Sequence, residues 1–203
     1  DGSVIKYLNV GKNKNLTKYE MICSQMTGKM PWGMSKVIRK DLVEKAGNGF
    51  LNINVGEEAI FSYEVLKRAQ YITFADKVIY HYVQSGTGQH TKGNYDPWKP
   101  LVEKMKEHLL ASGEYDKYED TINSLALKAL AICIYRCSFE KTIGKSLNLI
   151  RINYIEYKGK YDFSKINKAV LDKNTLIILE LLKKKLFIIL VLASKIRKMK
   201  MAY

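Results

Sequence analysis

The chain has 203 residues and a net charge of +14 at pH 7, from 34 basic and 20 acidic residues. Its apolar content of 47% is ordinary for a globular protein, which excludes intrinsic disorder as the default state, and its length fits one substantial domain or one domain and an appendage. The three cysteines make neither a disulfide framework nor a zinc pattern. Cys133 and Cys137 lie on an expected helix, and we expect buried free thiols in a reducing compartment.

The N-terminal part is expected to mix short helices with strands. We expect a strand at 4–10 and a helix from Lys18 to about Gln25. Either Asn15 or Thr17 is expected to cap this helix, and Gly28 to end it. A second short helix is expected from Asp41 to Ala46, followed by an extended segment at 50–55.

Two adjacent acids, Glu57 and Glu58, begin the next expected helix, which carries an apolar stripe at helical spacing. Alternating segments at 71–75 and 78–82 then predict two strands, and a loop rich in Gly, Ser and Thr follows. Acids in a first helical turn are favoured by unpaired backbone N–H groups, so surface charge is one interpretation. Paired acids beside a sheet edge and a polar loop are also typical of an acid/base site.

Two segments in this region carry a family resemblance. They are WGMSKVIRKDL at 32–42, and the run from GEE at 56–58 to VIYHY at 78–82. Their order and spacing resemble family 2 glycosyltransferases of the GT-A type, over residues 30–90. The resemblance implies an α/β fold: the C-terminal part of a GT-A domain, followed by a mostly helical region.

The resemblance also implies an activity. A sugar would move from a nucleotide-diphosphate-sugar donor to a hydroxyl of a glycan or lipid-linked acceptor, with inversion. Glu58 would take the acceptor proton, and Glu57 would be a supporting acid. A divalent metal, Mg or Mn, would neutralise the leaving diphosphate. The family's DxD motif and its βαβ nucleotide-binding half are absent from this sequence. We therefore expect the acceptor-side portion of such an enzyme, which alone should not catalyse transfer.

The sequence departs from the family pattern at two places. The second acid of the family motif is usually Asp, and here it is Glu58. The extra methylene of Glu moves the carboxylate by about an ångström, which matters in a positioned site. Trp32 also lies two residues earlier than is common before the Lys and Arg of the segment.

Several further residues are candidates for acceptor binding. Trp32, Lys36 and Arg39 would lie near the acceptor, where the Trp ring would stack on a sugar, or they form a half-buried Trp beside two solvated bases. His81 points away from its flanking tyrosines and is a candidate or a structural donor. Ser85 and Thr87 lie in a loop that suits a phosphate or sugar, or simply connects two elements. The chain begins at an Asp without an initiator Met or signal peptide, which fits a segment missing upstream.

The remaining chain is expected to be helical. Helices are predicted at 96–111, with Asp96 as N-cap, and at 114–139, and the segment at 145–157 is expected to be a further helix or a mixed segment. Residues 141–168 contain a mixture of lysines and tyrosines, which suits a packing edge. They also support an alternative function, a non-enzymatic basic module that binds nucleic acid, although no recognition motif appears.

The last expected helix runs from a cap at Asn174 or Thr175 to the end of the chain. Between Lys183 and Tyr203 there are seven basic residues and no acid, around an apolar run at 186–193. This run is too short to span a bilayer. It suits docking on an anionic membrane surface, or packing on the same domain or on a second copy. Docking predicts a cytoplasmic protein at the inner face of the membrane.

These predictions divide the chain into three parts. Residues 1–93 would be the C-terminal part of the catalytic domain, 94–172 a helical region, and 173–203 the basic and apolar C-terminal helix. We expect the sugar donor, the acceptor and an anionic membrane surface as partners, and no nucleic acid. The oligomeric state is left open.

Overall fold

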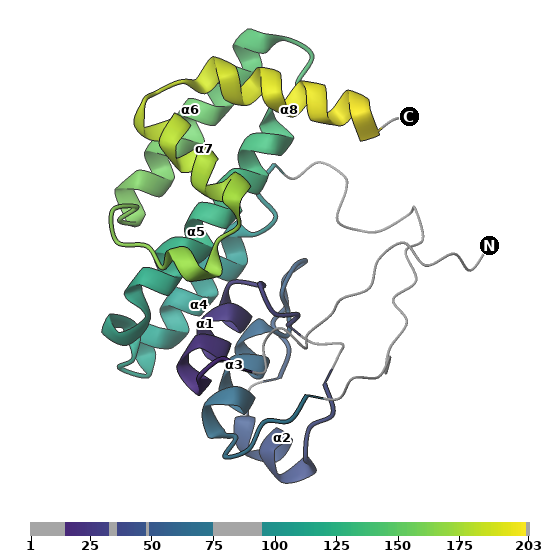
Figure 1. Cartoon of the computed structure of the whole chain (residues 1–203), viewed down its shortest axis with the longest axis vertical. Coiled ribbons are helices and arrows are strands. Elements are labelled where there is room, and N and C mark those ends of the chain that lie inside the picture. Colours follow the sequence, from purple (N-terminus) through teal and green to yellow (C-terminus); the bar gives the residue numbers. More distant parts are fainter. Residues whose placement is uncertain (1–14, 33–35, 48, 75–94, 202–203) are drawn as a thin grey trace, which may run out of the picture.

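The computed structural model describes residues 15–32, 36–47, 49–74 and 95–201. Within these ranges it is 66% helical, with no strand (Figure 1). The elements are α1 (Lys18–Met26), α2 (Lys40–Ala46), α3 (Ala59–Arg68), α4 (Lys99–Ala111), α5 (Tyr115–Cys137), α6 (Ile143–Lys160), η3 (Lys168–Val170), α7 (Lys173–Lys183) and α8 (Phe187–Met201).

The predicted α/β class, with part of a GT-A fold, is wrong for the described chain, which is helical. The expected extended segment at 50–55 forms bends, and 71–74 has no regular structure. A strand needs a partner for its ladder, but the Leu51 N–H donates instead to the Glu57 carbonyl at 2.7 Å. This bond closes a local turn. The strands predicted at 4–10 and 78–82 lie outside the described residues.

The first helices begin where the sequence indicates. The Thr17 side chain accepts from the Glu20 N–H, and the Glu20 carboxylate accepts from the Thr17 N–H at 2.8 Å, a capping box. Thr17, not Asn15, is therefore the cap of α1. The predicted helix at 41–46 is confirmed as α2, which ends at Gly47 with a φ of 64°.

The predicted start of α4 is wrong by about two residues. Its N-cap is Trp98, not Asp96, and Pro100 occupies the first turn, where the missing N–H costs nothing. The long helix predicted at 114–139 is confirmed as α5, and that predicted at 145–157 is confirmed within the longer α6.

The single C-terminal helix that the sequence predicts is two helices. Asp172 caps α7 by accepting from the Thr175 N–H, and the chain turns at Lys185, whose φ is 56°. The turn folds α8 back onto α5, α6 and α7, which buries Leu190 and Val191. Burial of this apolar side stabilises the fold more than the continuation of α7 as one straight helix would.

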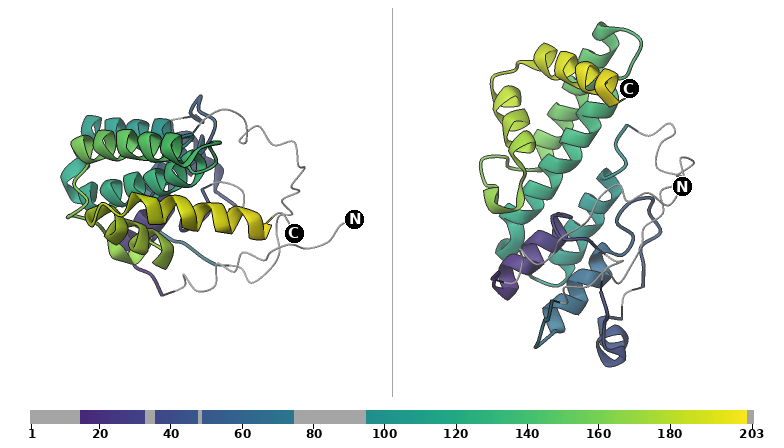
Figure 2. Two further views of the ribbon diagram at one scale, coloured as in Figure 1. Left: turned by 90° about the horizontal axis from the view of Figure 1, so that it is seen from above. Right: turned by 45° about the vertical axis from the view of Figure 1, so that its right-hand side comes forward.

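One hydrophobic core runs through the described chain, from Ile22 on α1 to Val191 on α8. The helix α5 lies at its centre and packs against α1, α4, α6, α7 and α8. Figures 1 and 2 show α8 crossing α5 and α6 at one end, and α1, α2 and α3 at the other. All three cysteines are buried free thiols, as predicted. In the described ranges, no helix has the length and apolarity to cross a bilayer.

Candidate functional site

Two tryptophans from distant segments meet beside the first turn of α3. The ring centroids of Trp32 and Trp98 lie 5.0 Å apart, at 58°. Trp32 follows α1, and Trp98 caps α4. A side chain at Gly28 would place its Cβ 2.8 Å from the Trp32 ring, and the φ of Gly28 is 65°. Glycine therefore permits this ring position for two independent reasons.

The backbone carbonyl of Trp32 collects two donors. The Lys36 ammonium donates to the Trp32 and Pro31 carbonyls, and the Ser62 hydroxyl of α3 also donates to the Trp32 carbonyl. These bonds attach the 31–36 segment to α3 across about thirty residues of sequence. The Trp32 carbonyl is thus held by donors from two different segments of the chain.

Glu58 is the N-cap residue of α3 and lies near Lys36. Its carbonyl accepts from the Ser62 N–H at 2.9 Å, while its side chain caps no backbone group. Burial lowers the pKa of the Lys36 ammonium to about 8, and the nearby Glu58 carboxylate opposes that shift by attraction. Glu57 and Glu58 are both half-buried. The Glu58 carboxylate is therefore near enough to attract the Lys36 ammonium, which is bonded to the Trp32 carbonyl.

Of the residues predicted as a site, Lys36 donates to the Trp32 carbonyl, and the Glu58 charge is near enough to attract the Lys36 ammonium, with Glu57 next to Glu58 in the chain. Arg39 is not part of this group. It caps α2 and pairs its guanidinium with Asp41 at 3.0 and 3.1 Å, with a side chain that is 81% exposed. This ion pair with Asp41, two residues further along the chain, keeps the Arg39 side chain at the exposed surface.

Three other predicted residues, His81, Ser85 and Thr87, lie outside the described residues.

Three residues of the site were not predicted. Ser62 follows Glu58 by four positions, a spacing that places both on one helix face and that the sequence does display. Trp98 and Lys128 meet the site only through tertiary packing. The Lys128 ammonium lies 5.8 Å from the centroid of the Trp98 ring and donates to the Thr27 carbonyl.

The metal predicted for the complete enzyme finds no fitting residues here. Among the described residues, His, Cys, Asp and Glu side chains form no group of three that could hold an ion. Glu57 and Glu58 alone do not make such a set. No chemical step in this site is therefore assigned to a metal.

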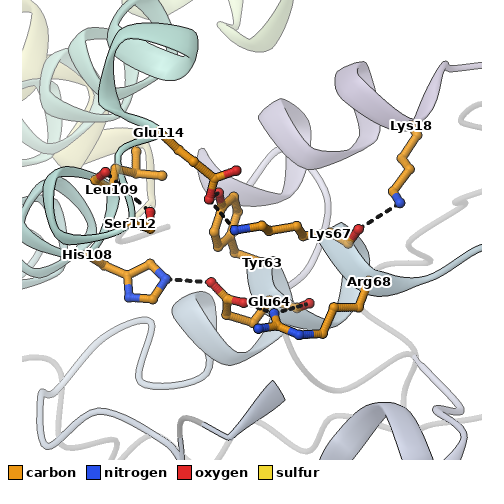
Figure 3. Close-up of polar contacts among 9 residues, drawn as sticks. All are labelled: Lys18, Tyr63, Glu64, Lys67, Arg68, His108, Leu109, Ser112 and Glu114. Atoms are coloured by element: carbon orange, nitrogen blue, oxygen red, sulfur yellow. Dashed lines mark hydrogen bonds and ion pairs between the residues drawn. The ribbon is translucent and has the colours of Figure 1, made fainter. Parts of the chain in front are cut away.

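A separate polar cluster holds α3 in place (Figure 3). The buried Glu64 carboxylate lies 2.7 Å from Nε2 of His108 on α4, and it also pairs with Arg68. The Lys18 ammonium of α1 donates to the Lys67 carbonyl at 2.7 Å. The helix α3, whose N-cap residue is Glu58, is thus attached to both α1 and α4 by polar contacts.

No family model, curated protein or solved structure matches the chain. The functional inference therefore rests on the residues and their arrangement.

Proposed function

We propose that this chain supplies the acceptor side of an enzyme that transfers a sugar from a nucleotide-diphosphate-sugar donor to a hydroxyl group of a glycan or lipid-linked acceptor. One observation carries the proposal. Trp32, Lys36 and Glu58 come from two segments of sequence and were predicted as acceptor-binding and catalytic residues; in the folded chain Lys36 donates to the Trp32 carbonyl, and the Glu58 charge is near enough to attract the Lys36 ammonium.

Each side chain has a role that suits its surroundings. The half-buried Glu58 carboxylate accepts the proton of the acceptor hydroxyl as its oxygen attacks the anomeric carbon. The Lys36 ammonium is a donor for acceptor oxygens. Trp32 and Trp98 offer aromatic faces to the apolar side of a sugar ring. The residues that bind the nucleotide are expected elsewhere in the functional enzyme.

A transfer assay on the native protein that contains this chain tests the base. We expect Glu58→Gln to abolish transfer from a panel of radiolabelled nucleotide-diphosphate sugars, with donor binding retained. Glu57→Gln should reduce turnover less. Arg39→Gln is the matched control, because Arg39 lies away from the site, and it should leave turnover near that of the wild type. Full turnover by Glu58→Gln would contradict the assignment of the base.

We further propose that the protein works at the inner face of the membrane, on which α8 lies. Ile188, Leu192 and Ile196 follow one another at one-turn spacing and are each about half exposed. The segment from Lys183 onward carries basic residues and no acid. An apolar helix face with basic flanks is typical of helices that lie in the interface of an anionic bilayer.

Vesicle flotation tests this location. We expect binding to phosphatidylcholine vesicles that contain phosphatidylglycerol, and much weaker binding to pure phosphatidylcholine. Leu192→Asp should weaken binding. Leu110→Asp replaces an equally exposed leucine on α4 and should not. Equal binding to both vesicle types would contradict the proposal.

The structure offers no specific support for nucleic-acid binding through the tyrosines of 141–168. Tyr157 and Tyr161 are buried, and the Tyr154 ring packs on Phe187 of α8, with centroids 5.7 Å apart. These tyrosine rings form a packing edge, which is one of the two interpretations of this segment given above. Rings packed in this way present no stacking platform for bases.

A further inference from the structure

An apolar groove of about 320 Å³ runs along α7 to the turn before α8. Leu176, Ile177 and Leu181 line it, together with Leu186 from the turn. Its volume is at the lower end of the range for small-molecule sites. Glu180 also borders the groove, but Lys183 pairs with its carboxylate at 3.0 Å. The groove therefore suits a hydrocarbon chain.

A second, basic cavity of about 170 Å³ lies where α7 begins. Lys29 and Lys128 line it, together with 170–172. The Lys29 ammonium donates to the Ala169 carbonyl at 2.7 Å, and the Lys128 ammonium to the Thr27 carbonyl. Since an ammonium has three N–H bonds, each lysine retains further donors.

Asp172, the acid that lines the basic cavity, offsets only one of its two positive charges. Its two oxygens accept from the N–H and the hydroxyl of Thr175, each at 2.9 Å, as the cap of α7. Burial lowers the pKa of the Lys128 ammonium to about 8, although Asp172 attracts it. A bound anion would offset the cost of burying this charge.

The two cavities are bordered by consecutive residues at the start of α7, because Asp172 lines the basic cavity and Lys173 lines the apolar groove. We propose that α7 binds a phosphate-bearing lipid, with the phosphate between Lys29 and Lys128 and the hydrocarbon chain along Ile177 and Leu181. A free phosphate would leave the groove empty, and a neutral hydrocarbon would leave the basic cavity, which holds two ammonium groups and one carboxylate, with an uncompensated positive charge. The inference concerns binding alone and does not rest on sugar transfer.

Isothermal titration of the full chain with three related molecules tests the site. The probes are 1-oleoyl lysophosphatidic acid below its critical micelle concentration, monoolein, which has the same chain without phosphate, and glycerol 3-phosphate, which has the phosphate without the chain. We expect lysophosphatidic acid to bind at least about tenfold more tightly than either other probe. Because Lys128 lies beside Trp98, tryptophan emission should change during the titration.

Variants separate the two halves of the site. Lys29→Met and Lys128→Met should each weaken lysophosphatidic acid binding by about tenfold and leave monoolein unaffected. Lys29 is exposed, so its variant remains informative if Lys128→Met does not fold. Ile177→Asp should weaken binding of both chain-bearing probes. Lys158→Met and Leu110→Asp make the same chemical changes on α6 and α4, and both should bind like the wild type.

Three results would overturn the proposal. Glycerol 3-phosphate that binds as tightly as lysophosphatidic acid would show a site for soluble phosphates. Equal affinity for monoolein would show a groove that is indifferent to charge. Wild-type affinity in Lys29→Met and Ile177→Asp would place the lipid elsewhere on the chain.

Discussion

The Tyr63 hydroxyl donates a 2.8 Å hydrogen bond to Oε2 of Glu114, which joins α3 to the residue immediately before α5. The Lys67 ammonium donates to the same oxygen. Burial acts to raise the pKa of the Glu114 carboxyl, but the bonds from Lys67 and Tyr63 outweigh it, and the pKa lies below its ordinary value. A carboxyl with a lowered folded-state pKa stabilises the fold above its unfolded pKa, and this contribution is lost as the pH falls through the folded value.

Glu114→Gln is therefore expected to lower the free energy of unfolding by about 1 kcal/mol at pH 7. The difference from the wild type should shrink as the pH falls through the lowered folded-state pKa of Glu114, because the protonated carboxyl and Gln are then both neutral. Urea unfolding at pH 7 and pH 3 measures both values. Glu107→Gln, in an exposed pair with Lys104, is the control and should change stability by less than about 0.5 kcal/mol. A difference that persists at pH 3 would contradict the ionic role of Glu114.

Glycine-to-alanine substitutions should rank in a defined order. A Cβ at Gly56 would lie 2.7 Å from Leu101, and its φ is 74°, so Gly56→Ala should cost about 2–4 kcal/mol. Gly113 has a φ of 69° but open space, so the cost there should be about 1 kcal/mol. Gly144 lies in α6 with open space and no positive φ, and Ala there should stabilise by about 0.5 kcal/mol. Thermal unfolding of the three variants gives the order, and equal costs at Gly56 and Gly113 would exclude the Leu101 contact.

Stability should rise with pH in the alkaline range. Burial lowers the pKa of Lys36 and of Lys128 to about 8 in the folded chain, from 10.5. Between these values the unfolded chain binds more protons, so the free energy of unfolding increases with pH. Lys36→Met should reduce the rise by roughly 1–3 kcal/mol over this window. Denaturant unfolding between pH 7 and 9.5 measures the first part of this rise in the free energy of unfolding.

Lys40→Met is the control for that experiment, because the Lys40 side chain is 90% exposed. It should keep the full alkaline rise. A rise that is the same in wild type and Lys36→Met would show that the Lys36 ammonium is solvated in the folded chain.

The turn between α7 and α8 contains Lys185 with a φ of 56°, a conformation that costs a non-glycine residue roughly 1 kcal/mol. Lys185→Gly should therefore raise the free energy of unfolding, by up to about 1 kcal/mol. Lys183→Gly, at the last residue of α7, should instead lower it by about 0.5–1 kcal/mol. If both variants are destabilised equally, the left-handed turn is not a source of strain.

Local signals predicted the helices well. The capping box of Thr17 and Glu20 and the long apolar stripe of α5 require only neighbouring residues, and both were visible in the sequence. The break at Lys185 was not, because the turn forms only when Leu190 and Val191 are buried against distant helices. The alternation of residue types over 71–74 favours a strand, but alternation alone does not supply the partner strand that a β-ladder needs.

The group of candidate site residues was likewise predictable only where neighbouring residues in the sequence carry the signal. Trp32, Lys36 and Glu58 were predicted through a family resemblance, and their catalytic and binding roles stay a prediction; Ser62 has a helical spacing from Glu58 that the sequence displays. Arg39 was assigned to the site by the same resemblance, but its neighbour Asp41 competes for the guanidinium. Trp98 and Lys128 reach the site from α4 and α5, and no local pattern connects them with Trp32.

The central place of α5 has a consequence for how the chain opens. Its amides are covered by helices on several sides, so they should exchange with solvent deuterium only through global unfolding. The helix α2 buries only Ala46 and should exchange through local opening at a much lower free energy. Hydrogen exchange should therefore divide the chain into a slow unit around α5 and a fast unit at α2, next to the segment that carries Lys36.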